Sequence, residues 1–387
     1  MNGISNVPAV RIIADDLTGA LDAAAPLAAR LGTFPVGWGA PRVPRFNHAV
    51  FDTETRDVEQ HTAIIRTAEA AALWWRGFGG LAFKKVDSMW RGHGAAEIAA
   101  AMTAGEFDCA VVAPAFPAQG RLTRDGAQWV IGADGARCIA PDLVADLCSA
   151  GLPAAHERAV GSAACVRVCD ATDQDALIAV VARHTRPGTR TLWCGSAGLA
   201  HALAATITAG DHAPARHVVA AAGPVLVIVG SDHAVTQEQA SALARAPGVL
   251  EWWLDLDRPE ATSLVPTSDI IALRFSAGDG TERALVTMKI QQALIHAVTA
   301  LPRPRLVIVI GGATLFALSV ALAANSLSVE GERRVGVPDA SWIDGRWSGI
   351  PVVTKSGGFG GPDLLVALVL AAATAATATP LVMVRKN

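Results

Sequence analysis

The chain has 387 residues, of which 51% are hydrophobic and 17% are charged, a composition that fits a folded globular protein and excludes an intrinsically disordered one. Its 32 Lys and Arg residues nearly balance 35 Asp and Glu residues, so a net charge of −3 gives no overall field favouring nucleic acid or an anionic membrane. At ~100–200 residues per domain, this length predicts two domains with a cleft available between them.

The N-terminus lacks a basic segment followed by an apolar stretch, so no secretory signal is expected and a reducing cytoplasm is the simplest setting. The six cysteines show no CxxC spacing, which predicts neither a zinc site nor a disulfide scaffold. Two uncharged apolar runs, 306–329 and 364–384, contain helix breakers such as Gly311 and Pro380. They favour a strand-turn-helix segment and a core helix over membrane spans.

Short apolar runs that end in Gly, Asp or Ser and lead into Ala-rich stretches recur along the chain. Examples are residues 10–14, 110–113, 225–229 and 306–310. This pattern predicts an α/β protein with mainly parallel sheets flanked by helices. Turn-formers and small residues mark 208–224 as the best linker candidate. We therefore predict an N-terminal domain over 1–220, a C-terminal domain over 224–387 and an active site in the interdomain cleft.

The first predicted strand leads directly into Asp15 and Asp16, followed by an Ala-rich helix. Ligands of α/β proteins bind where strands end and helices begin, so these carboxylates are candidate site residues. A helix cap formed by Asp15 or Thr18 is the alternative.

A second strand ends in a polar cluster that contains Arg56. Its guanidinium can bind a carboxylate through two parallel hydrogen bonds. The alternative is a surface ion pair with Glu54 or Asp52.

The third segment follows the strand at 81–85 and combines an acid, a hydroxyl and a guanidinium. It contains Asp87, Ser88, Met89, Trp90 and Arg91. A polyhydroxylated acid needs acceptors for its hydroxyls and arginine for its carboxylate, and this segment offers both. A proline-fixed loop after the strand at 109–113 then holds Arg121. Because all these segments follow strand ends in one domain, we expect them to converge.

Glycine-containing turns follow three apolar strands of the C-terminal half. The candidate residues there are Ser231, Gly311, Gly312, Ala313, Thr314, Lys355, Gly357 and Gly358. Backbone N–H groups at such turns and at helix N-termini suit phosphate groups. The last loop is not a P-loop, because Lys355 precedes its glycines.

Taken in order, the motifs IIADDLTGA (12–20), KKVDS with RG (84–92), PAFP with GR (114–121) and KSGGFG (355–360) resemble those of the four-carbon acid sugar kinases. The resemblance implies ATP-dependent phosphorylation of a terminal hydroxyl on threonate, erythronate or a 3-oxo-tetronate. It implies an acid site built from Asp16, Arg56 and residues 87–91, and an ATP site built from the glycine turns. The chain departs from the family pattern at Met89-Trp90, His93 and Ala313.

Phosphoryl transfer depends on positioning and charge stabilisation. We therefore predict that Asp16 is the base or orienting group for the hydroxyl. We also predict that Mg²⁺ and the glycine loops bind the triphosphate of ATP. A nucleotide-dependent sugar-acid dehydrogenase is one alternative, although no G-x-G-x-x-G is present. A non-catalytic sugar-acid-binding protein is the other. Neither nucleic acid nor a membrane is expected as a partner, and a homo-oligomer stays open.

Overall fold

The computed structural model describes residues 8–132, 135–159, 163–208, 223–258, 267–276 and 283–377. The chain divides into two compact units. Unit 1 comprises Met1–Ala215 and Ser326–Ala340, and unit 2 comprises Arg216–Asn325 and Ser341–Asn387. The linker that we expected at 208–224 lies outside the described residues from 209 to 222, so the domain boundary stays a prediction.

Unit 1 contains a mainly parallel sheet with the strand order β16-β2-β3-β1-β4-β11-β5-β10-β9, in which β16 and β2 form the antiparallel pair. Its strands are β1 (Val10–Ala14), β2 (Phe34–Gly37), β3 (His48–Asp52), β4 (Leu81–Lys85), β5 (Cys109–Ala113), β9 (Ala154–His156), β10 (Val166–Val168), β11 (Thr191–Gly195) and β16 (Ser326–Arg334). A separate antiparallel sheet is formed by β6 (Arg121–Arg124), β7 (Ala127–Gly132) and β8 (Gly135–Ala140). A short 3₁₀ turn, η1 (Pro117–Gln119), precedes β6.

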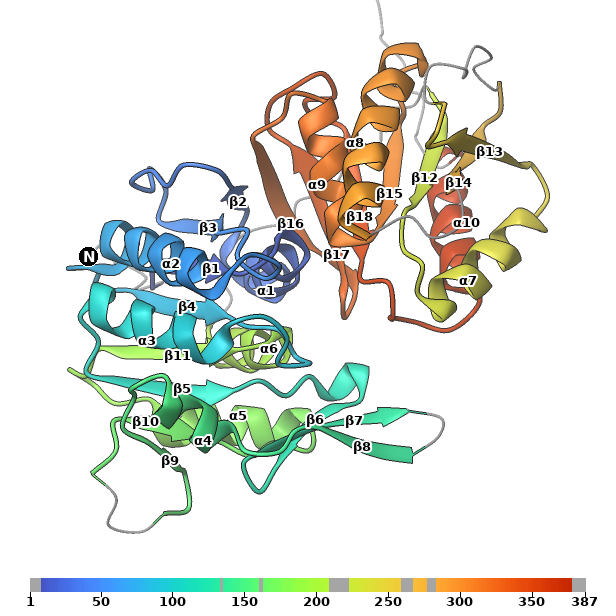
Figure 1. Ribbon diagram of the computed structural model, residues 1–387. Coiled ribbons are helices and arrows are strands. Elements are labelled where there is room, and N and C mark those ends of the chain that lie inside the picture. Colours follow the sequence, from blue (N-terminus) through green and yellow to red (C-terminus); the bar gives the residue numbers. More distant parts are fainter. Residues whose placement is uncertain are drawn as a thin grey trace, which may run out of the picture. The chain divides into compact units, whose positions relative to one another are not determined.

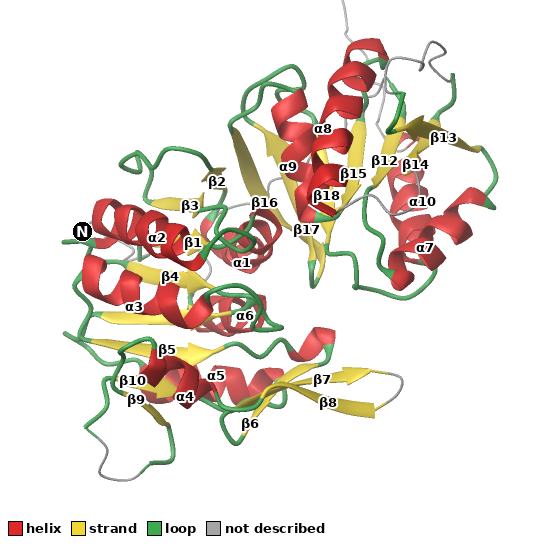
Figure 2. Cartoon of the chain, viewed as in Figure 1, coloured by secondary structure: helices red, strands yellow, loops and turns green. Residues whose placement is uncertain are grey.

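Helices cover both faces of the unit 1 sheet. They are α1 (Leu17–Leu31), α2 (Gln60–Trp75), α3 (Gly94–Gly105), α4 (Leu143–Ser149), α5 (Gln174–His184) and α6 (Ala197–Thr206). Figures 1 and 2 show α2 and α3 on one face and α1 and α6 on the other, and each of these pairs is in contact. Ala23, Ala24 and Ala25 of α1 are fully buried although consecutive helix residues point in different directions, so this helix is enclosed by the sheet, α6 and β16.

Unit 2 contains the parallel strand order β13-β14-β12-β15-β18. The strands are β12 (Val225–Val229), β13 (Val249–Asp255), β14 (Ile270–Ser276), β15 (Leu306–Ile310) and β18 (Pro351–Lys355). Helices α8 (Arg283–Ala300) and α9 (Gly312–Ala321) pack together, as do α7 (Ala234–Ala244) and α10 (Leu364–Thr377). The division between the units falls within β17 (Val337–Trp342).

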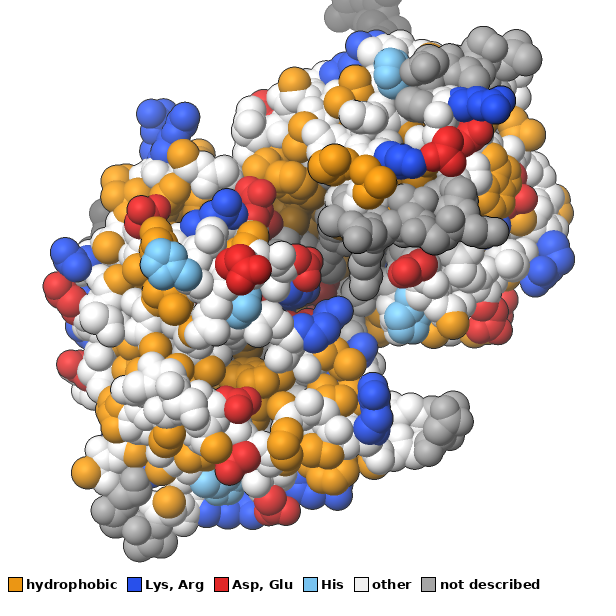
Figure 3. All heavy atoms as spheres, viewed as in Figure 1, with side chains coloured by type: hydrophobic (Ala, Val, Ile, Leu, Met, Phe, Trp, Pro, Cys, Tyr) orange, Lys and Arg blue, Asp and Glu red, His pale blue; other side chains and the backbone are white. Residues whose placement is uncertain are grey.

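The α/β class with mainly parallel sheets is confirmed, and the apolar runs at 10–14, 225–229 and 306–310 are strands with those bounds. The run at 306–329 continues through α9, as expected, and α10 begins the second apolar run, whose last residues lie outside the described part. Over the residues that can be described, no helix combines the length and apolar character that a membrane span needs. On the face shown in Figure 3, basic and acidic side chains are interspersed.

One segment differs from the expected continuous C-terminal domain. Strand β16 groups with unit 1, where it pairs with β2 and packs against α1. The alternation of buried and half-buried residues along β16 gives it an apolar side for this contact. The sequence order alone does not reveal the return, because the partner strand lies nearly 300 residues earlier in the chain.

Candidate functional site

The centre of the unit 1 sheet places three loops side by side. Strands β3, β1 and β4 are neighbours and all run parallel, so their carboxyl ends lie at one edge. Asp15 and Asp16 follow β1, Arg56 comes shortly after β3, and Asp87 comes shortly after β4. The acid cluster is defined here as these four residues together with Arg91.

Arg56 is the centre of the acid cluster. Its Nε and Nη2 donate to the two carboxylate oxygens of Asp15 at 2.8 and 2.9 Å, which forms a bidentate pair. Its Nη1 lies 2.5 Å from Oδ2 of Asp16, and its Nη2 lies 3.8 Å from Oδ1 of Asp87. The surface pair with Glu54 or Asp52 was therefore the wrong alternative, because Arg56 turns inward and only 13% of its side chain is exposed.

Asp16 has two structural contacts. It is the N-cap of α1, where its Oδ1 accepts a hydrogen bond from the Gly19 backbone N–H at 2.9 Å, while its Oδ2 meets Arg56. The alternative in which Asp15 or Thr18 caps the helix is therefore wrong. The Asp16 side chain keeps 23% exposure, against 5% for Asp15. Asp16 is therefore the more accessible of the two carboxylates following β1.

The loop after β4 holds Asp87 against Arg91. Nε and Nη2 of Arg91 donate to the Asp87 carboxylate at 2.6 and 2.9 Å, and 62% of the Arg91 side chain is exposed. Trp90 has a positive φ of 58°, a conformation uncommon for a bulky residue, and its indole N–H donates to Asp146 at 2.9 Å. Ser88 and Met89 lie half-buried in the same turn.

The small sheet of β6, β7 and β8 lies next to the loop after β4. The amide of Gln128 on β7 donates to the Ser88 carbonyl at 2.8 Å, which links the small sheet to the loop after β4. The charges of Asp87 and Arg91 both act on Arg121. The buried Nε of Arg121 has no hydrogen-bond partner among the described residues. Burial lowers the pKa of Arg121. Its guanidinium is thus partly unsatisfied beside the acid cluster.

Charge and burial shift the pKa values of the carboxylates of the acid cluster in different directions. Burial alone would raise the pKa of Asp15, but the charges of Arg56 and Lys85 bring it below its usual value. For Asp87, burial is likewise outweighed by hydrogen bonds from Arg91 and by the charge of Arg56, and its pKa is lowered. Burial and the neighbouring carboxylates raise the pKa of Asp16. Asp16 is therefore the one carboxylate of the acid cluster whose pKa is raised, despite the opposing charge of Arg56, which makes it the better proton acceptor of the three.

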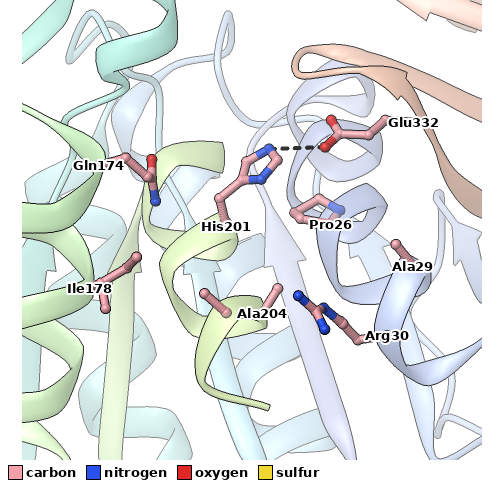
Figure 4. Close-up of a pocket in the computed structure, with 9 residues that line it drawn as sticks. Pro26, Ala29, Arg30, Gln174, Ile178, His201, Ala204 and Glu332 are labelled. Atoms are coloured by element: carbon pink, nitrogen blue, oxygen red, sulfur yellow. Dashed lines mark ion pairs between the residues drawn. The ribbon is translucent and has the colours of Figure 1, made fainter. Parts of the chain in front are cut away.

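A pocket of about 340 Å³ lies beside α1, between that helix, α6 and β16. Figure 4 shows His201 and Glu332 facing each other there, with His201 Nε2 and Glu332 Oε1 3.3 Å apart. Asp22 on α1 is buried, and its Oδ1 has no hydrogen-bond partner in the described part of the chain. The charges of Lys85, Asp16, Glu332 and His201 all act on it. Asp22 is thus influenced by Asp16 of the acid cluster and by the His201–Glu332 pair.

Asp22→Asn is expected to stabilise the protein above neutral pH. Burial raises the pKa of Asp22 to about 7, well above the 3.8 of an exposed aspartate. The folded state therefore binds more protons than the unfolded state between pH 4 and 7, and the contribution of Asp22 to stability falls as pH rises through this window. The penalty is complete above pH 7 and amounts to at most roughly 4 kcal/mol.

Thermal unfolding at pH 5 and pH 8 measures this contribution. The Asn variant should gain melting temperature at pH 8 and little at pH 5, whereas Asp175→Asn, at an exposed position of α5, should change neither. Equal shifts at both pH values would show that Asp22 is not the titrating group.

Unit 2 places its glycine turns at the carboxyl ends of three neighbouring parallel strands, β12, β15 and β18. A Cβ on Gly357 would lie 2.2 Å from Oγ of Ser231, and one on Gly230 would lie 2.0 Å from Oγ1 of Thr314. These close approaches bring the three turns together and exclude any side chain at both glycines. Gly311, with φ of 101°, precedes α9, whose first N–H groups have no intrahelical acceptor. This terminus is suited to an anion.

Lys355 ends β18 with its side chain buried. Its Nζ donates to the Ser356 and Gly357 carbonyls at 2.8 and 3.4 Å, and burial lowers its pKa to about 8. Gly358 lies against His233, which is the N-cap of α7. Lys355 is thus a cation held by the backbone of the glycine loop that follows it.

Two residues that hold the loop after β18 were missing from the prediction. Gln239 Nε2 donates to the carbonyls of Phe359, Gly360 and Gly361 at 3.0, 3.1 and 2.8 Å. Thr236 Oγ1 donates to the Gly357 carbonyl at 2.6 Å. Both lie on α7, three residues apart, and both are fully buried polar residues. Their burial is a property of the fold and their partners are at least 120 residues away, so no local pattern in the sequence marks them.

The structure thus brings the predicted residues together as two sets, one in each unit. The binding roles of the acid cluster, of Ser88, Met89 and Trp90, and of the unit 2 turns stay predictions. Ala313 is exposed at the start of α9, and Gly312 beside it is half-buried.

Comparisons with known proteins agree with this division. Residues 10–143 match a family model described as a sugar-binding N-terminal domain, and residues 270–365 match one described as a nucleotide-binding C-terminal domain. A D-threonate kinase of Bordetella bronchiseptica is 32% identical over 93% of this chain and 96% of its own length. A D-erythronate kinase of Heliobacterium modesticaldum is 27% identical over 92% of this chain and 94% of its own length.

The fold also has solved counterparts. The crystal structure of a Haemophilus influenzae protein superimposes with a TM-score of 0.64 at 18% identity, covering 91% of this chain and 97% of that one. At that identity the likeness concerns the fold alone.

Proposed function

The chain belongs to the four-carbon acid sugar kinase family, and we propose that it transfers the γ-phosphoryl group of ATP to the terminal hydroxyl of threonate, erythronate or a 3-oxo-tetronate. The relatives named as D-threonate and D-erythronate kinases support this substrate class. The observation that carries the proposal is the acid cluster, in which an accessible carboxylate at the start of α1 is surrounded by arginines.

The substrate carboxylate binds at the exposed side of the acid cluster. Arg56 already makes a bidentate pair with Asp15 and reaches Asp16, so its role is to hold these acids while it helps to define the pocket. Arg91 is more than half exposed, and Arg121 has a buried Nε without a hydrogen-bond partner among the described residues, while its Nη1 already donates to Gln119. These two guanidinium groups can bind a carboxylate in fork geometry. Ser88, Met89 and Trp90 line the same loop and face the carbon chain.

Asp16 orients the hydroxyl that attacks phosphorus and accepts its proton. A new bond forms between the hydroxyl oxygen and the γ-phosphorus, the bond from that phosphorus to the β,γ-bridging oxygen breaks, and ADP leaves with the bonding electrons. The raised pKa of Asp16 suits this role, because a base is most effective when its pKa approaches the working pH. Its contact with Arg56 holds the carboxylate in position, which limits the reorganisation needed in the transition state.

The triphosphate of ATP binds to the glycine turns of unit 2. The fit rests on the close approach of Gly357 to Ser231, on the unpaired N–H groups at the start of α9 and on the Lys355 side chain. Mg²⁺ would neutralise phosphate charge there, and Ser231 and Thr314 offer the oxygen donors that this ion prefers. The reaction further requires the acid bound by unit 1 to meet the phosphate bound by unit 2.

The test is a coupled assay of ADP formation with purified protein, ATP and Mg²⁺. The acids are D- and L-threonate, D- and L-erythronate and their 3-oxo forms, and the product is identified by mass spectrometry and phosphorus NMR. We expect ADP to form in the presence of one of these acids, and that acid to be recovered with a phosphate monoester on its terminal oxygen. Reduction of NAD⁺ or NADP⁺ by the acid without ADP would identify a dehydrogenase. Thermal stabilisation by an acid without either reaction would identify a binding protein.

A further inference from the structure

A second cluster of chemically reactive side chains lies in unit 1 among residues that the proposed reaction does not use. Glu157 follows β9, Cys169 follows β10, and His184 is the last residue of α5. Sγ of Cys169 lies 3.5 Å from Nε2 of His184, which lies 3.8 Å from Oε2 of Glu157. The three ligand atoms all lie within 4.8 Å of one another. In the sheet, β10 and β9 are separated from β4 of the acid cluster by β11 and β5.

These distances suit a tetrahedral metal ion. Bonds of about 2.0–2.3 Å at tetrahedral angles place neighbouring ligand atoms roughly 3.3–3.8 Å apart, so a movement of about 1 Å or less completes the site. A thiolate, an imidazole and a carboxylate are ligands of Zn²⁺, whereas Ca²⁺ and Mg²⁺ prefer oxygen donors alone. We infer that Glu157, Cys169 and His184 bind Zn²⁺, with a water molecule as the fourth ligand.

The surrounding backbone holds the ligands in place. The Glu157 N–H donates to the Val168 carbonyl at 2.9 Å, and the Cys169 N–H donates to the Val112 carbonyl at 2.9 Å. Oε1 of Glu157 accepts from the Asp170 N–H at 3.2 Å, which leaves Oε2 directed toward His184. Because outer hydrogen bonds orient metal ligands, this arrangement favours a preformed site.

Arg183 is a positively charged side chain that competes with a metal ion for Glu157. Its Nη2 donates to Oε2 of Glu157 at 2.7 Å, and 51% of its side chain is exposed. Two other ion pairs lie nearby and share the Asp170 carboxylate. His156 is 3.1 Å from it and Arg158 is 3.5 Å from it. The exposed Arg183 side chain can turn into solvent when the ion binds. Its positive charge nevertheless weakens binding, which provides a sharp test.

The sequence carries no motif for this site, because its ligands come from three elements and are spaced by 12 and 15 residues. Cys169 is fully buried, which makes it a poor nucleophile for a soluble substrate but not a poor ligand. Binding releases the thiol proton to solvent as the Zn–S bond forms, while His184 binds as the neutral imidazole through Nε2. The ion would tie the edge strands β9 and β10 to the end of α5.

The experiment uses the full chain without an affinity tag, stripped with a chelator and titrated with Zn²⁺ or with Co²⁺ as a spectroscopic probe. We expect one ion per chain, proton release, a higher melting temperature, and Co²⁺ bands of tetrahedral geometry with thiolate charge transfer. Cys169→Ser and His184→Asn should each weaken Zn²⁺ binding by more than about 100-fold, beyond the loss of an outer hydrogen-bond partner. Cys109→Ser and His61→Asn, the latter at an exposed position of α2, are the matched controls and should retain binding.

Arg183→Gln separates a metal site from an ordinary hydrogen-bonded network and does not risk the core. Removal of its charge should tighten Zn²⁺ binding severalfold, because it no longer competes for Glu157. Circular dichroism of each variant establishes that it is folded. The inference is overturned by substoichiometric Zn²⁺, by Co²⁺ bands that survive Cys169→Ser, or by an Arg183→Gln variant with unchanged affinity.

Discussion

Arg56→Met is expected to abolish the proposed kinase activity and to destabilise unit 1. The substitution leaves the buried Asp15 carboxylate without its bidentate partner and removes the cation that separates it from Asp16 and Asp87. Breaking a buried ion pair by removing one partner costs about 3–5 kcal/mol. Displacement of Asp16 by the resulting repulsion should reduce kcat/KM by at least about 100-fold. Urea unfolding and the ADP-formation assay measure the two effects.

Two further variants make this prediction specific. Arg66→Met is the matched control, because Arg66 lies on α2 and its guanidinium donates to the carbonyls of Thr53 and Glu54 in the same loop without contacting a carboxylate of the acid cluster in the described structure. It should retain activity and most of its stability. Arg56→Lys keeps the positive charge but cannot donate two parallel hydrogen bonds to Asp15. Relative to Arg56→Met, it should therefore recover part of the stability and little of the activity. Wild-type turnover in Arg56→Lys would contradict a positioning role for the guanidinium.

Much of the acid cluster could be foreseen because parallel strands have a simple consequence. An apolar run of five residues followed by polar residues predicts a strand end, and neighbouring parallel strands bring such ends to one edge. Asp15, Asp16, Arg56, Asp87 and Arg91 all follow such strand ends, so their convergence can be predicted from the sequence. The family resemblance, which the relatives confirm, used two of these segments, 12–20 and 84–92, together with 114–121 and the glycine loop at 355–360.

The partners within the cluster could not be foreseen, because they depend on side-chain direction. Arg56 has Glu54 nearby in sequence, yet it turns inward to carboxylates 40 and 41 residues earlier. The N-cap role of Asp16 depended on the one residue at which the helix begins, the least certain feature of a helix prediction. Strand β16 pairs with β2, and Gln239 donates to the carbonyls of the glycine loop, so both are contacts between segments distant in sequence. Local patterns carry no information about them.

Asp16→Asn is expected to lower kcat by roughly 10²–10⁴-fold, the range for loss of a positioned general base. The substitution suits the question because asparagine caps helices about as well as aspartate, so the contact with the Gly19 N–H can persist. A loss of activity therefore reports the missing charge and proton acceptor rather than a damaged helix. The KM for the acid should change less than kcat, because Arg91 and Arg121 remain.

Asp173→Asn is the matched control for the cap, since Asp173 caps α5 through the Ala176 N–H at 2.8 Å. The pH profile adds a second readout. Because the pKa of Asp16 is raised, wild-type kcat should fall with acidification at a pH above the usual aspartate range, and the Asn variant should lose this limb. Near-normal turnover in Asp16→Asn, or an unchanged acid limb in a weakly active variant, would remove Asp16 from the role of base. The acid cluster would then act by positioning the substrate alone.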